Sequence, residues 1–127
     1  MDTWATPRHG VTMPFVLQHV IELRLAPTTG ALSVVLPALR RRLSILGQDA
    51  EVLRVGVTGD PIRRAREHRG YGFEWFEVLW DTSSAERAGD AEAALYQHAL
   101  VKGLLLAGRR SGGIRGEGPF VVYAAGR

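Results

Sequence analysis

A strand, a tight turn and the start of a helix follow one another within residues 51–70, and this succession constrains the fold more than any other segment. Residues Glu51–Thr58 (EVLRVGVT) are rich in β-branched side chains, which favours a buried strand. A Gly-Asp-Pro turn at residues 59–61 follows, with an N-cap aspartate before a proline at the first helical position. The helix then continues as IRRAREHR and is expected to end at Gly70. The segment therefore predicts a strand–turn–helix unit.

The rest of the chain continues this alternation of strands and helices. Strands are expected at Phe15–Leu25, Phe73–Asp81 and Phe120–Ala124, and helices at the leucine-spaced segment 31–47 and at Ser84–Lys102. Pro37 suits the first turn of a helix better than its interior, so we expect the first of these helices to begin near it. The second is expected to begin at a capping box, Ser83-Ser84-Ala85-Glu86.

These elements fit one domain of the α/β class. A chain of 127 residues is long enough for one domain, which we place at 1–127, with residues 1–14 flexible or loosely docked and the helix 31–47 inserted between the first two strands. We predict an α+β type of fold, with a small, largely antiparallel central sheet of three or four strands flanked by helices. The sequence has no cysteine, which excludes disulfide frameworks, thiol catalysis and cysteine-based zinc sites.

Targeting signals are not evident. The first 14 residues lack a basic start followed by an apolar core, and no apolar run approaches the ~20 residues of a membrane span. We therefore expect a cytoplasmic protein with no membrane contact.

Arginine dominates the positive charge of the chain. Lys102 is the only lysine among 16 Lys and Arg residues, and the net charge is +3. A guanidinium binds phosphate in a bidentate fork, so the excess permits nucleic-acid binding. A compositional bias towards Arg, Gly and Ala is the alternative that these totals leave open.

The positions of the arginines are more informative than their number. Arg63, Arg64, Arg66 and Arg69 crowd one short helix, together with His68. Arg64 and His68 are four residues apart and share a face of that helix. A guanidinium and an imidazole suit a phosphodiester, because one can stabilise charge while the other moves a proton. A solvated basic face is the alternative interpretation.

Glu92 is the candidate metal ligand. At 100° per residue, Ala88, Ala91, Leu95 and Ala99 form a narrow inner face of the helix Ser84–Lys102, and Glu92 falls within it. A carboxylate on a packing face is costly unless it is paired or binds a cation. A salt bridge to an arginine is the alternative.

Aromatic residues interleave with the basic cluster, at Tyr71, Phe73, Trp75 and Trp80. Alternation places Phe73 and Trp75 on one face of a strand, which favours core packing over the stacking of nucleic-acid bases.

Residues 55–69 (VGVTGDPIRRAREHR) resemble the central signature of the GIY-YIG nuclease family. In that family a strand ends in Tyr-Ile-Gly, and a helix follows with an arginine ten residues after the tyrosine and often a histidine four residues later. Here Arg54-Val55-Gly56 stands in the Tyr-Ile-Gly place, Arg64 follows ten residues after Arg54, and His68 follows four residues after that. The family's metal-binding glutamate, on a later helix, matches Glu92.

The resemblance extends over residues 52–124, because the glycine-rich GGIRGEGPFVVYAA is similar to C-terminal portions of bacterial members. Two tyrosines of the family pattern are missing from their places. Arg54 replaces the tyrosine of the second motif, and no Gly-Ile-Tyr stands shortly before it. The helix 31–47 occupies the space of a tight hairpin, so we expect Phe15–Leu25 to be the strand of the first motif.

The resemblance implies a metal-dependent endonuclease that hydrolyses DNA phosphodiester bonds with one divalent ion, Mg²⁺ or Mn²⁺. Glu92 would hold the ion, Arg64 would stabilise the transition state, and His68 would act as general base or orient the water, with Tyr71 and Tyr96 as alternative bases. Phosphate contacts are expected from Arg54, Arg63, Arg66 and Arg69.

DNA is the expected partner, and a homodimer or a partner protein would supply target selection. Two other classes stay open: a catalytically degenerate module that binds nucleic acid without cutting it, and a protein-interaction module.

Overall fold

The computed structural model describes residues 21–107 and 116–127 of the chain. Its elements are β1 (Glu22–Arg24), α2 (Leu32–Gly47), β2 (Leu53–Thr58), α3 (Pro61–Gly70), β3 (Trp75–Thr82), α4 (Ala85–Lys102) and β4 (Phe120–Gly126). The strands form one sheet in the order β1-β3-β4-β2, in which β4 is antiparallel to both of its neighbours and β1 is parallel to β3. The predicted α/β class with a small, mostly antiparallel sheet is therefore confirmed.

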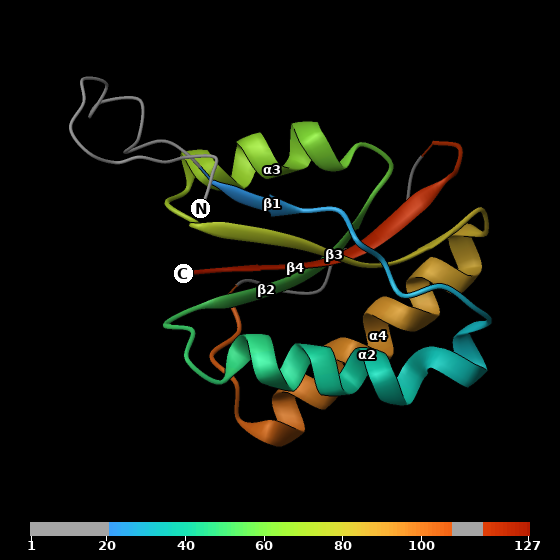
Figure 1. Ribbon diagram of the computed structural model, residues 1–127, viewed down its shortest axis with the longest axis horizontal. Helices are drawn as coiled ribbons and strands as arrows, with labels where there is room; N and C mark the ends of the chain where they lie inside the picture. The colour runs from blue at the N-terminus through green and yellow to red at the C-terminus, as the bar shows by residue number, and fades with distance from the viewer. Residues whose placement is uncertain (1–20, 108–115) are drawn as a thin grey trace.

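Helices cover both faces of the sheet (Figure 1): α3 lies on one side, and α2 and α4 lie together on the other. The larger core cluster fills the layer between the sheet and the pair α2 and α4, where Leu39, Leu43, Leu53, Leu79, Leu95 and Val122 are fully buried. The smaller cluster lies under α3 and contains Ala65, Phe76, Val78, Tyr123 and Ala125. The two layers thus differ in size: the layer under α2 and α4 is the larger core, and the layer under α3 is the smaller one.

Helix α2 begins at Leu32, five residues before Pro37, so the expected start near the proline is wrong. Leu32 and Val35 are buried and fix the first turn of the helix against the core. A proline inside a helix leaves the carbonyl four residues earlier without its N–H partner. Here that carbonyl belongs to Ser33, which is exposed, as Pro37 is, so water can bond to it.

Helix α4 begins one residue later than the predicted capping box. Ser84 is the N-cap, and its hydroxyl accepts a hydrogen bond from the backbone N–H of Arg87 at 3.1 Å. In the expected capping box, the side chain of Glu86 would accept a hydrogen bond from the backbone N–H of the N-cap residue. In the structure, the backbone N–H of the N-cap residue Ser84 donates instead to the hydroxyl of Thr82. Neither α4 nor any other helix in the described ranges is long and apolar enough to cross a membrane.

Strand β1, which lies in the expected strand Phe15–Leu25, is at the opposite edge of the sheet from β2, so the two strands are not neighbours. The place beside β2 is taken by β4, which pairs residue by residue along Leu53–Thr58. An ion-pair group ties β1 into position instead, since Arg24 and Arg42 each donate to the buried carboxylate of Glu77 at 2.7 Å. Residues 1–14 and the first part of the expected strand lie outside the described residues.

The α2 layer offers a direct test of the core. Leu39→Ala should lower the free energy of unfolding by about 2–5 kcal/mol, because it removes a fully buried side chain. Val34→Ala, on the same helix but 75% exposed, is the matched control and should change it by less than about 0.5 kcal/mol. Urea unfolding measures both, and equal losses in the two variants would contradict the packing described here.

Candidate functional site

The side chain of Tyr123 lies over Gly56. The register of β4 sets Tyr123 opposite Gly56 of β2 and Val78 of β3. A Cβ at position 56 would lie 2.5 Å from the phenol oxygen, so a residue other than glycine would displace the ring. The ring also stacks on Phe76, with centroids 4.3 Å apart and planes 20° apart. These contacts fix the phenol on the α3 side of the sheet.

A hydrogen-bond network connects the Tyr123 hydroxyl with α3. The Nε of Arg64 donates to the phenol oxygen at 3.1 Å, and the Nε2 of His68 lies 3.4 Å from the same oxygen. The Nδ1 of His68 is 3.0 Å from the carbonyl oxygen of Arg64. A carbonyl only accepts, so Nδ1 carries the hydrogen, and Nε2 is left to accept from the hydroxyl. The hydroxyl is therefore oriented from both sides.

His68 is held neutral by its surroundings. The side chain is 1% exposed, and its ring meets those of Tyr71, Phe73, Phe76 and Tyr123 edge-on. Burial lowers the pKa of His68 to about 4, helped by the charges of Arg64 and Arg54. Burial likewise raises the pKa of Tyr123. Both groups are thus uncharged at neutral pH.

A pocket of about 290 Å³ opens beside this network. It is lined by Arg54, Arg64, His68, Tyr71, Phe73 and Ala107. Two of these residues carry guanidinium groups, and Glu67 balances only one of them, through a 2.6 Å ion pair with Arg64. The Nε of Arg54 is buried and has no hydrogen-bond partner among the described residues. A buried donor without an acceptor is costly, so this pocket favours an anion with free acceptor oxygens.

The structure brings three of the predicted site residues together, namely Arg54, Arg64 and His68. The other three basic residues, Arg63, Arg66 and Arg69, are exposed on α3. They provide positive charge around the pocket rather than inside it.

Glu92 lies apart from this group. As predicted, it is buried on the inner face of α4, with Ala88, Ala91 and Leu95 as neighbouring buried residues. Helix α4 is on the other side of the sheet from α3, and Glu92 does not line the pocket. The negative charge of Glu92 nevertheless acts on Tyr123, because it raises the pKa of the phenol, although burial raises that pKa more. No group of three potential metal-ligating side chains occurs in the described part of the chain.

Sequence reasoning missed Tyr123 as a site residue. The segment FVVYA was recognised as a strand, but nothing local in it shows that its tyrosine meets Arg64, 59 residues earlier. The aromatic prediction was also wrong in part, because Phe73 packs with the α3 layer and Trp75 with the opposite layer. Tyr71 is 70% exposed and does not belong to the core.

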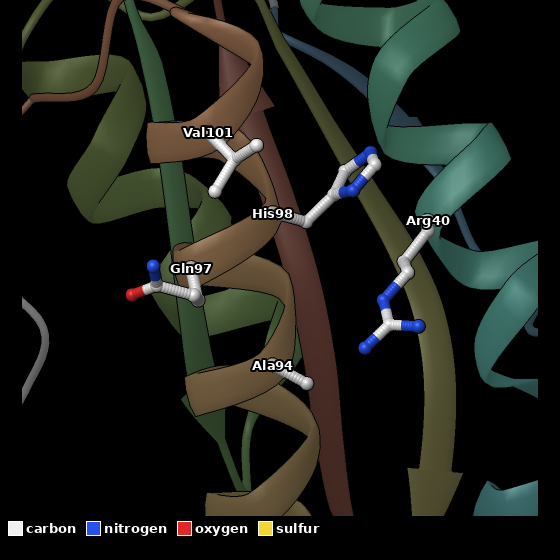
Figure 2. A pocket seen from close by; sticks show the side chains of 5 residues that line it. All are labelled: Arg40, Ala94, Gln97, His98 and Val101. Carbon is white, nitrogen blue, oxygen red and sulfur yellow. The ribbon is translucent and has the colours of Figure 1, made fainter.

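A second hollow, of about 320 Å³, lies along α4 where it faces α2 (Figure 2). It is lined by Arg40, Ala94, Gln97, His98 and Val101. The ring of His98 points from α4 towards α2, where its Nε2 lies 2.7 Å from the hydroxyl of Ser44. Burial, followed by the charges of Lys102 and Arg40, lowers the pKa of His98. The imidazole joins the two helices, so we assign it a packing role.

No protein-family model matches the chain, and no curated protein or solved structure matches it either. We therefore infer the function from the residues and their geometry.

The buried imidazole predicts a pH dependence of stability. The folded-state pKa of His68 is about 4, below the ordinary 6.5, so the unfolded chain binds the proton more readily. Stability from this residue is complete above pH 6.5 and is lost as the pH falls towards 4, by about 2 kcal/mol between pH 7.5 and 5.

Urea unfolding at several pH values measures this loss. His68→Gln should flatten the dependence, whereas His98→Gln should keep most of it. An NMR titration of the wild type in which the His68 ring protonates near pH 6.5 would contradict the burial described here.

Proposed function

We propose that this protein binds DNA at the pocket beside α3 and hydrolyses a phosphodiester bond there. The observation that carries the proposal is the hydroxyl of Tyr123, held by Arg64 and His68 at the side of two guanidinium groups. The resemblance to the GIY-YIG nucleases calls for a tyrosine on the strand beside Arg54-Val55-Gly56. Strand β4 supplies one, although it comes from the other end of the chain.

Arg54 and Arg64 are the groups suited to hold the scissile phosphate. Their guanidinium groups are partly buried, where hydrogen bonds to an anion are stronger than in open water. Arg63, Arg66 and Arg69 are exposed along α3 and would contact phosphates on either side. Contacts of this kind read no sequence and make the affinity depend on salt.

The phenol of Tyr123 is buried and does not line the pocket, so its suitable role is to hold the guanidinium of Arg64 in place for the phosphate. One lone pair of the phenol oxygen accepts from the Nε of Arg64, and the phenol hydrogen points to the Nε2 of His68. Because His68 accepts the phenol hydrogen, the phenol oxygen presents a lone pair to the guanidinium of Arg64. The positive charge of Arg64 stabilises the extra charge that develops on the phosphate oxygens.

A single hard divalent ion fits the residues present. Mg²⁺ is commonly held by one or two carboxylates together with substrate phosphate, and Glu92 is a buried carboxylate whose charge acts on Tyr123. Helix α4 packs against β2, the edge strand that carries Arg54. When bound there, the ion would neutralise charge on the leaving oxygen.

Cleavage of a DNA substrate with Mg²⁺ or Mn²⁺ tests the catalytic proposal. Arg64→Ala should lower kcat by about 100-fold or more, because it removes a charge that acts in the transition state. Tyr123→Phe and Glu92→Gln should each lower kcat by at least about tenfold. Arg41→Ala removes an exposed arginine from α2 and is the matched control, with little expected change.

Two results would count against the catalytic proposal. Equal activity in all of these variants would exclude the assigned residues. DNA binding by the wild type without any cleavage would favour a degenerate module, the alternative suggested by Arg54 in the place of a tyrosine.

The ion pair between Arg64 and Glu67 predicts a variant that binds DNA more tightly. The carboxylate lies 2.6 Å from the guanidinium that we assign to the phosphate, so it competes with the ligand. Glu67→Gln should raise the affinity for DNA about two- to fivefold at low salt, as expected for a partly exposed ion pair. Glu86→Gln makes the same charge change on α4, and fluorescence anisotropy that finds the same gain in both variants would exclude a local effect.

A further inference from the structure

The pocket beside α3 has two kinds of lining. Arg54 and Arg64 supply charge from β2 and α3, whereas Tyr71, Phe73 and Ala107 supply apolar surface. A phosphate uses only the first kind. The apolar remainder, in a hollow of about 290 Å³, is close to the smallest volume typical of a small-ligand site.

The aromatic side of the pocket is held in place by the end of α3. The backbone N–H groups of Tyr71 and Phe73 both donate to the carbonyl oxygen of His68, at 3.0 and 3.1 Å, and that of Gly72 donates to Arg69 at 2.9 Å. The rings of Tyr71 and Phe73 meet the imidazole edge-on, with centroids 6.4 and 5.1 Å away. Tyr71 is nevertheless 70% exposed, so much of its ring stays open to a ligand.

On the charged side of the pocket, one hydrogen-bond donor of Arg54 has no acceptor among the described residues. The Nε of Arg54 is buried without a hydrogen-bond partner in the described ranges, and no carboxylate lines the pocket. A ligand that satisfies both sides carries an anionic group with acceptor oxygens joined to a flat, apolar face. A nucleotide has this combination, since its base can stack on an aromatic ring while its phosphate binds arginine.

We propose that the pocket accepts one unpaired nucleotide of DNA, with its phosphate on Arg54 and Arg64 and its base stacked on Tyr71. The phosphate half of this inference rests on the proposed function, and the base half rests on the aromatic wall. A base inside a duplex has both faces covered by its neighbours, so it stacks on a protein ring only after leaving the helix. The preferred substrate is therefore DNA with a single-stranded nucleotide beside the bound phosphate, such as an overhang or a gap.

Binding of one sequence in two forms tests the inference. The probes are a single-stranded oligonucleotide with one 2-aminopurine and the blunt duplex of the same sequence, measured without a divalent ion so that neither is cut. The single strand should bind more tightly, and its 2-aminopurine fluorescence should be quenched. Tyr71→Ala should lower the ratio of single-strand to duplex affinity about tenfold, and Tyr71→Phe should restore it.

Leu100→Ala removes an exposed large side chain from α4, away from the pocket, and should leave that ratio unchanged, with thermal unfolding confirming that each variant folds. Equal binding of both forms by the wild type, or an equal effect of Tyr71→Ala on both, would overturn the inference. The proposed function would survive that result if Arg64→Ala still weakened duplex binding. If Arg64→Ala weakened neither form, the phosphate site itself would be wrong, and both proposals would fall.

Discussion

The pairing of β4 with β2 is the constraint on which the geometry of the site depends. Its register sets Tyr123 against Gly56, and the absent side chain at that glycine lets the phenol lie over β2 and reach α3. A slip of one residue would turn Tyr123 to the opposite face of the sheet, into the layer filled by α2 and α4. One strand pairing therefore determines whether Arg64 and His68 have a hydroxyl between them.

The α3 layer separates neutral polar groups from charged ones by depth. His68 and Tyr123 are each about 1% exposed, and burial keeps both uncharged by shifting their pKa values in opposite directions. Arg54 and Arg64 lie farther out, where their stems pack against the layer and their charged ends border the pocket. This arrangement avoids the cost of a buried charge and still leaves positive potential at the pocket. Glu67 pairs with Arg63 and Arg64 on its own helix, so an external anion is the natural partner for Arg54.

Local signals in the sequence predicted the elements better than their neighbours in space. The turn at residues 59–61 begins a helix as expected, with Asp60 accepting from the N–H of Arg63, and Glu92 is buried as the helical wheel indicated. Strand order was not predictable in this way, because which strand lies beside β2 is decided by packing between segments far apart in the chain. The role of Tyr123 depends on that order, so it was missed. His68 was expected to act as a general base or to orient the water, but four aromatic rings enclose it, and they come from the segment after α3, from β3 and from β4.

A site is defined by which strands are neighbours, and the order of those strands along the chain does not matter to the reacting atoms. In the interpretation proposed above, the tyrosine that the family pattern places before the Tyr-Ile-Gly strand comes after it here, yet it occupies the adjacent strand. The other departure, Arg54 in place of a tyrosine, does change the chemistry. An arginine adds positive charge and hydrogen-bond donors but offers no hydroxyl to orient water. This exchange strengthens the binding of phosphate and removes a hydroxyl from the place where the family pattern has one, so affinity and cleavage need not vary together in this protein.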